Sequence, residues 1–124
     1  MATKIILKKT PLEVVVKFVG TGVQTLTLAE LATANETLTT PTVNIHSVKL
    51  SSPTSQKNVI TRNAIDILQL YGNEDFLFNS SSLTEQNNGD ITVNLGGDGT
   101  MILTLRKISG YIDPDTQNFV PGVK

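Results

Sequence analysis

The fold is decided by residues 90–106, which read DITVNLGGDGTMILTLR. Apolar and polar residues alternate on both sides of the glycines, and a period of two is typical of half-buried strands. The apolar residues of the two alternating runs are Ile91, Val93, Leu95, Met101, Leu103 and Leu105. Because glycine favours tight turns, we expect Gly96–Gly99 to form the loop of a hairpin and to supply its positive-φ positions.

The same period of two extends over most of the chain. Beyond the stretch above, strands are expected at Lys4–Lys9, Glu13–Val19, Gln24–Leu28, Thr42–Leu50, Asn58–Leu70 and Phe76–Phe78. Gly20-Thr21-Gly22 is expected to join the second and third of these strands as a hairpin. The strand over Asn58–Leu70 is expected to bend near Asn63.

One strand contains a change of phase. Val43 and Ile45 share one face, whereas Val48 and Leu50 have the opposite parity. A single extra residue near His46-Ser47, a β-bulge, would place all four apolar side chains on the same side of the sheet.

Turn signals recur every 8–12 residues or so between about eight short strands, and this spacing is typical of a β-sandwich. We therefore predict an all-β fold, with a single β-sandwich or jelly-roll-like domain of antiparallel strands over residues 1–112. Residues 28–40 favour one helical turn at most, within a connection. Residues 113–124 contain two prolines and few apolar residues, so an arm or tail is expected there. A chain of 124 residues suits one core better than two.

Composition argues against several partners. The formal net charge is -1 and the basic residues are scattered, so a nucleic-acid partner is not expected. The chain has no cysteine, which excludes disulfides and thiolate metal sites. Its first apolar run, Ile5–Leu7, has three residues, whereas a signal peptide needs about 7–15 and a spanning helix about 20. We expect synthesis in a cytoplasm and no insertion into a membrane.

The motif GGDGT at Gly96–Thr100 is the nucleotide-site signature of NAD kinases and related lipid kinases. In those enzymes the glycines let the backbone approach a phosphate at a strand-to-helix turn, so a helix is required after the motif. Residues 101–109 instead continue with a period of two. The hairpin loop is therefore the preferred interpretation, and no cofactor is expected.

Other candidate reactive residues give no constellation. His46 is the only histidine, and both a catalytic triad and a metal site need further partners. The acidic residues with a conceivable role are Asp66, Glu74, Asp75, Asp90, Asp98, Asp113 and Asp115. Most of them lie in turn-like or tail sequence, where aspartate is common for conformational reasons. We predict no catalytic, cofactor-binding or metal-binding residue, and hence no enzyme.

Three segments carry a resemblance: ATKIILKKT near the start, NVITRNAIDILQLYGNEDFLF in the middle and DITVNLGGDGTMILTLRKISGY near the end. In strand-and-turn texture they resemble small virion structural proteins of contractile-tailed phages, particularly those that infect marine cyanobacteria. The resemblance implies a virion protein made in the host cytoplasm, such as a head decoration protein bound to the capsid lattice or a neck or tail accessory protein. Its partners would be the major capsid protein or other virion proteins.

The alternative function is a carbohydrate- or receptor-binding β-module that uses Tyr71, Tyr111 and the polar loops. Phe76 and Phe78 share one strand face, so core packing is the expected use of these rings. A homo-oligomer, such as a trimer, is expected because open sheets leave edge strands that invite another chain. The expected edges are Lys4–Lys9 and Phe76–Phe78.

Overall fold

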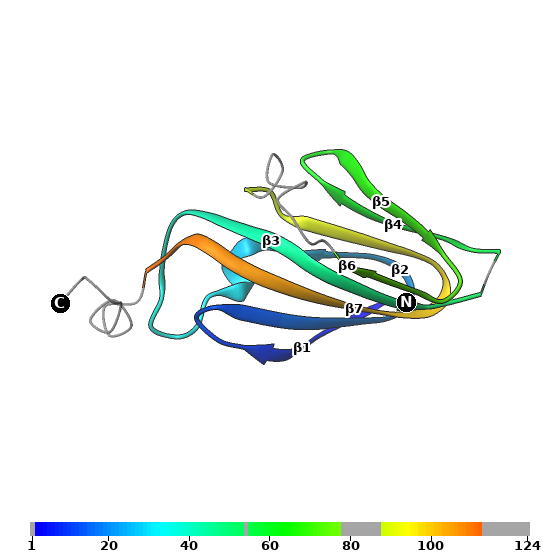
Figure 1. Cartoon of the computed structure of the whole chain (residues 1–124), viewed down its shortest axis with the longest axis horizontal. Coiled ribbons are helices and arrows are strands. Elements are labelled where there is room, and N and C mark those ends of the chain that lie inside the picture. Colours follow the sequence, from blue (N-terminus) through cyan, green and yellow to red (C-terminus); the bar gives the residue numbers. More distant parts are fainter. Residues whose placement is uncertain (1, 54, 78–87, 113–124) are drawn as a thin grey trace.

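The computed structural model describes residues 2–53, 55–77 and 88–112. These residues form one antiparallel sheet of seven strands and one short 3-10 helix (Figure 1). The elements in chain order are β1 (Thr3–Lys9), β2 (Glu13–Leu26), η1 (Leu28–Leu31), β3 (Thr37–Ser51), β4 (Lys57–Arg62), β5 (Ile65–Tyr71), β6 (Glu74–Leu77) and β7 (Ile91–Ile112). The all-β prediction is confirmed.

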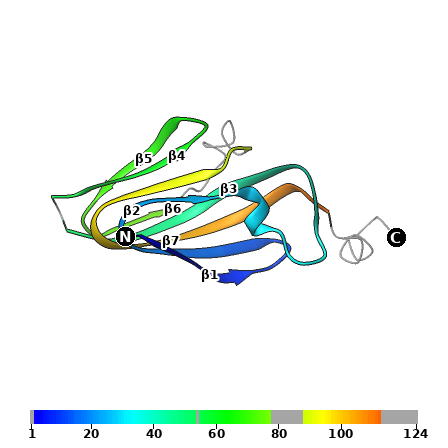
Figure 2. The same cartoon turned by 180° about the vertical axis from the view of Figure 1, so that it is seen from behind.

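Two long strands, β2 and β7, pair with each other and bend together. The first half of β2 pairs with the second half of β7, and the second half of β2 with the first half of β7. One layer therefore contains β1, β3 and β6, and the other contains β4 and β5. In Figure 1 the yellow and orange parts of β7 run through the two layers, and Figure 2 shows the same bend from behind.

Both hairpins predicted at glycine-rich segments are wrong. Gly20-Thr21-Gly22 lies inside β2, and Gly96–Gly99 lies inside β7. At the corner Gly20 faces Gly99, and two residues later Gly22 faces Leu95. β7 thus has three residues at the bend where β2 has one, so the chain turns a corner instead of reversing.

The core lies between the two layers, and the predicted alternation locates it correctly. Val14, Val16 and Phe18 of β2 are fully buried. The remaining core residues on the strands are Leu26, Val43, Ile45, Val48, Leu50, Ile60, Leu70, Ile91, Val93, Leu95, Met101, Leu103 and Leu105. Both apolar runs flanking the GGDG segment therefore point inward, as the period of two predicts.

The bulge predicted in the strand around His46 is confirmed. Ile45 pairs with Leu105 and Ser47 pairs with Thr104, so His46 is the extra residue. The strand itself, β3, is longer than predicted and begins at Thr37. The helical turn expected in the preceding connection is η1, closed at its start by a capping box in which Thr27 and Glu30 each bond the other's backbone N–H.

Residues 58–70 form a hairpin and not a single bent strand. β4 and β5 pair closely, with Arg62 opposite Ile65. Asn63 and Ala64 both have positive φ, 51° and 63°, as a two-residue turn of type I′ requires. The sequence has Asn-Ala at this turn and not the usual Asn-Gly, so it does not predict a hairpin here.

The predicted C-terminal arm, residues 113–124, lies outside the described residues, as does Phe78. Among the described residues no helix has the length and apolar character needed to cross a membrane.

Candidate docking edges

The first strand, β1, ends the sheet on one side, where its one neighbour among the described strands is β2. Ile5, Ile6 and Leu7 are all exposed, with Leu7 52% exposed. The pairing of β1 with β2 shifts between Ile6 and Lys8, which leaves Leu7 as the bulged residue without an opposite partner. The first expected edge strand is thus an edge, and it presents aliphatic side chains to the surroundings.

The apolar surface of β1 continues toward the turn that leads into β2. Leu12 in this turn and Ile108 on β7 are both exposed. They line a shallow hollow of about 450 Å³ together with Lys8, Thr10, Glu13 and Arg106. The Lys8 ammonium donates to the Glu13 carboxylate at 3.0 Å, and this hydrogen bond, together with the Lys8 charge, holds the pKa of Glu13 below its usual value.

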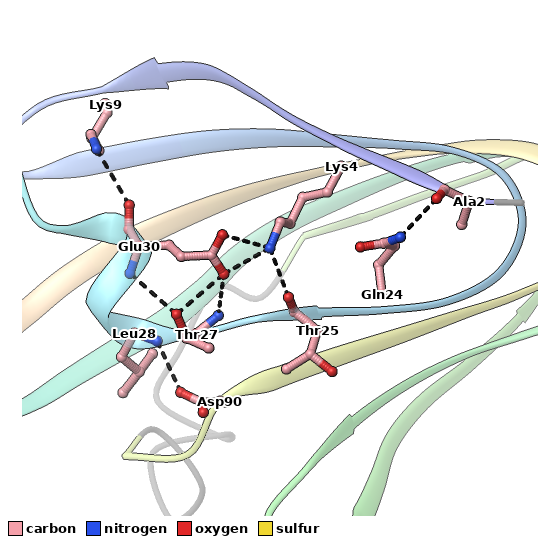
Figure 3. Close-up of polar contacts among 9 residues, drawn as sticks. All are labelled: Ala2, Lys4, Lys9, Gln24, Thr25, Thr27, Leu28, Glu30 and Asp90. Atoms are coloured by element: carbon pink, nitrogen blue, oxygen red, sulfur yellow. Dashed lines mark hydrogen bonds and ion pairs between the residues drawn. The ribbon is translucent and has the colours of Figure 1, made fainter.

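Polar side chains connect β1 and the residue before it with the opposite layer (Figure 3). Lys4 donates to the backbone carbonyl of Thr25 at 2.8 Å and to the Glu30 carboxylate at 2.7 Å. The Gln24 side-chain amide donates to the backbone carbonyl of Ala2 at 2.7 Å. Because these bonds reach across to the second half of β2, they close the open side of the sandwich.

Glu30 connects this attachment to the helix η1. Its carboxylate accepts from Lys4 and from the backbone N–H of Thr27 at 2.8 Å. Partial burial opposes ionisation, but the bonds from Lys4 and Thr27 outweigh it and hold the pKa of Glu30 below its usual value. Asp90 adds a further cap by accepting from the backbone N–H of Leu28 at 2.9 Å.

Among the strands that the structure describes, β6 is the last of the same layer on its other side, and it pairs with β3. All four of its residues are exposed, including Phe76 and Leu77, the latter to 54%. The expectation that Phe76 packs in the core is therefore wrong. Phe76 and Leu77 border a shallow hollow of about 280 Å³ whose floor includes the buried Val48.

A buried polar cluster at the end of the sandwich near η1 was not predicted. The Arg62 guanidinium donates to the backbone carbonyls of Val43 at 2.7 Å and Gly89 at 2.7 and 3.0 Å. Burial lowers the pKa of Arg62 to about 10, so the group remains charged at neutral pH. These bonds connect β4 with β3 and with the turn before β7, which is a structural role.

An ion pair lies in the same region. Lys107 donates to Glu36 at 2.7 Å, and the two side chains are only 2% and 1% exposed. The Lys107 ammonium also lies 4.7 Å from the centre of the Tyr111 ring, and the Tyr111 hydroxyl donates to the backbone carbonyl of Leu28 at 2.6 Å. Burial raises the pKa of Tyr111, and the nearby Glu36 charge adds to the rise.

A signal for these residues was present in the sequence. Lys107 has the same parity as Met101, Leu103 and Leu105, and Arg62 has the same parity as Ile60. A charge that continues the buried face of a strand is itself buried, provided that the strand stays regular.

The GGDGT segment is a site of close backbone packing. Gly96, Gly97 and Gly99 do not have positive φ, which corrects the expectation of a loop. A Cβ on Gly96 would collide with the backbone carbonyl of Lys57, and one on Gly97 would lie 2.5 Å from Gln56. Asp98 is exposed and accepts from the Thr21 hydroxyl at 2.9 Å across the corner. The segment continues as a strand and not as the helix that follows it in the kinases.

Asn58 fixes this corner from the inside. It is fully buried, and its amide nitrogen donates to Ser52, Gln56 and Leu70 at 3.0–3.2 Å. Its carbonyl oxygen accepts from the backbone N–H of Gly96 at 3.2 Å.

The remaining candidate residues do not converge. His46 is half-buried at the bulge, and the described residues contain no group of three or more His, Asp or Glu side chains able to hold a metal ion. Tyr71 of β5 pairs with Lys57, and the next residue of β4, Asn58, pairs with Leu95 just before the glycines of β7. Tyr71 therefore lies near the glycine corner. Tyr111 lies farther along β7, roughly 35–40 Å beyond the corner at 3.3 Å per residue. The rings of Tyr71 and Tyr111 therefore do not form one platform.

No protein-family model matches this chain, and no curated protein matches its sequence.

Proposed function

We propose that the chain is a non-enzymatic structural protein that docks to other proteins through the exposed edges of its sheet. In the phage setting suggested by the sequence resemblance, it is a decoration protein that binds the capsid lattice. The observation that carries the proposal is the exposure of apolar side chains along the edge strands β1 and β6.

Exposed edges are costly for a protein that remains alone. Unpaired backbone groups and apolar side chains on an edge strand favour pairing with another chain. Ile5, Ile6 and Leu7 contribute little to the core, since each is more than a third exposed. Their retention on an edge strand is explained if a partner covers them.

The test is binding of the purified chain to empty phage heads that lack it, measured by co-sedimentation. We expect Leu7→Ser to weaken binding and Val23→Ser to leave it unchanged. Val23 is a matched control because it is similarly exposed, at 59%, but lies on β2. A wild-type chain that does not bind such heads, and binds glycans instead, would favour the carbohydrate-binding alternative.

A further inference from the structure

In the layer that contains β1 and β3, basic residues lie on neighbouring strands of one sheet face. Ile102 of β7 has Lys17 of β2 opposite it on one side and Lys49 of β3 opposite it on the other. Residues directly opposite each other on paired strands share a face of the sheet. Both chain neighbours of Ile102 are buried, so the face that these three residues share is the outer one.

Arg106 extends this outer face along β7. It follows Ile102 on the same side of the strand, with Thr104 between them. Neighbouring strands are about 4.8 Å apart and a strand rises about 3.3 Å per residue, which places the Cα atoms of Lys17 and Lys49 about 10 Å apart and that of Arg106 about 13 Å from that of Ile102. We call this area, with Lys17, Lys49 and Arg106 around Ile102 and Thr104, the basic face.

The three cations of the basic face are not neutralised by direct contacts within the described part of the chain. None of their side chains forms an ion pair or a hydrogen bond with another described residue. Lys49 and Arg106 are exposed, and Lys17 is half-buried. Their charges are therefore accessible to a partner.

Two carboxylates lie beside the basic face, and they leave it positive. Glu13 is opposite Arg106, and Asp75 is opposite Lys49. Glu13 is bonded to Lys8, so Lys8 offsets its charge. The three cations then face the single charge of Asp75, on a chain whose formal net charge is -1.

We propose that the basic face docks an acidic protein surface on which carboxylates flank an aliphatic side chain. The cations would bind the carboxylates, and Ile102 would contact the aliphatic group. The inference rests on the proposed function, because Ile5 of the β1 edge lies opposite Lys17 and joins the two surfaces. It adds a second surface and the charge of the partner.

The arrangement of charge favours a protein over a nucleic acid or a membrane as the partner. A continuous row of phosphates would meet the carboxylates of Glu13 and Asp75 as well as the cations, and it would offer nothing to Ile102. Protein interfaces instead combine an apolar centre with a polar rim and are enriched in arginine. An aliphatic residue with three cations around it matches that pattern.

The experiment reverses one charge at a time in the full chain. Lys17→Glu, Lys49→Glu and Arg106→Glu change the basic face, and Lys57→Glu is the matched control. Lys57 is exposed on β4 in the other layer, so its reversal makes the same change of net charge away from the basic face. Lys17→Gln replaces Lys17→Glu if urea unfolding shows that the half-buried position does not accept a carboxylate.

Binding is measured by co-sedimentation with empty phage heads and by retention on immobilised poly-glutamate. Each variant of the basic face should weaken binding to the heads by roughly tenfold or more, because the reversed charge repels the carboxylates of the partner. Lys57→Glu should bind as the wild type does. Poly-glutamate should retain the wild type at low salt despite its net charge of -1, and added salt should release it.

The outcomes separate this inference from the proposed function. If the wild type binds heads and the variants of the basic face bind equally well, the inference is wrong and the proposed function stands. If the wild type binds no heads, the proposed function fails and poly-glutamate decides the inference. Retention that the variants of the basic face lose would then support the inference, and a lack of retention would overturn it.

Duplex DNA and vesicles of phosphatidylserine and phosphatidylcholine are the alternative probes. The wild type should bind both of them more weakly than poly-glutamate. Tighter binding to either one, lost in the same variants, would overturn the assignment of a protein partner.

Discussion

The central strands and the edge strands of this sheet use apolar residues in opposite ways. β2 and β7 contribute ten fully or almost fully buried side chains to the core, namely Val14, Val16, Phe18, Leu26, Ile91, Val93, Leu95, Met101, Leu103 and Leu105. β1 and β6 expose Ile5, Ile6, Leu7, Phe76 and Leu77. The central pair thus carries much of the core, whereas the docking that we propose would use the edges. Substitutions in the two regions should separate stability from binding.

The largest effect on stability is expected at the buried ion pair. Lys107→Met removes the partner of a Glu36 carboxylate that is 1% exposed, and leaving a buried charge uncompensated costs about 3–5 kcal/mol. Urea unfolding should show this loss. Adding Glu36→Gln to Lys107→Met should recover part of it, and a loss below about 1 kcal/mol for the single variant would mean that the pair is not buried in solution.

A smaller loss is expected at the glycine corner. Gly96→Val directs a side chain into the backbone of Lys57, and such overpacking typically costs 1–3 kcal/mol or so. Asp98→Asn is the matched control two residues away, because an amide oxygen still accepts from Thr21, and it should stay within about 0.5 kcal/mol. Equal stability of the two variants would contradict the close packing that replaces the predicted loop.

A still smaller, pH-dependent effect is expected at the attachment of β1. The folded-state pKa of Glu30 lies below its ordinary value of 4.5, so its contribution to stability is present above 4.5 and is lost as the pH falls through the folded pKa. Because the pair with Lys4 is partly exposed, its loss should cost under about 1 kcal/mol.

Hydrogen exchange is the appropriate measurement for this attachment. Amides of Thr3–Lys9 should lose protection relative to those of β7 between pH 6 and pH 3, after correction for intrinsic rates. Glu30→Gln should show the same loss already at pH 6. If β1 keeps its protection in both cases, the contacts of Glu30 do not hold the strand.

Local patterns predicted the faces of the strands but not their partners. The parity of Val14, Val16 and Phe18 identified the core, and the phase change in β3 located the bulge at His46. The alternation of apolar and polar residues within one strand shows which of its faces is buried. It does not show which other strand lies beside it.

Glycine was the main source of error. A glycine pair permits a reversal, but it equally permits a close approach of another backbone, as at Gly96 and Lys57. Which of these occurs depends on residues distant in the chain, since Gly20 meets Gly99. The two edge strands were predicted near β1 and β6, but the order of the strands between them was not.

The smallest change in the free energy of unfolding is expected for a substitution on the edge strand β1. Compared with the same substitution on β7, it tests directly whether folding and docking depend on different residues. Leu7→Ala and Leu103→Ala make the same chemical change at a 52% exposed edge position and at a fully buried central one. Leu103→Ala should lower the free energy of unfolding by about 2–5 kcal/mol and leave binding to phage heads intact while the protein is folded. Leu7→Ala should change the free energy of unfolding by no more than about 0.5 kcal/mol and should weaken binding. If Leu7→Ala binds as the wild type does, or unfolds as easily as Leu103→Ala, the edge is not a docking surface.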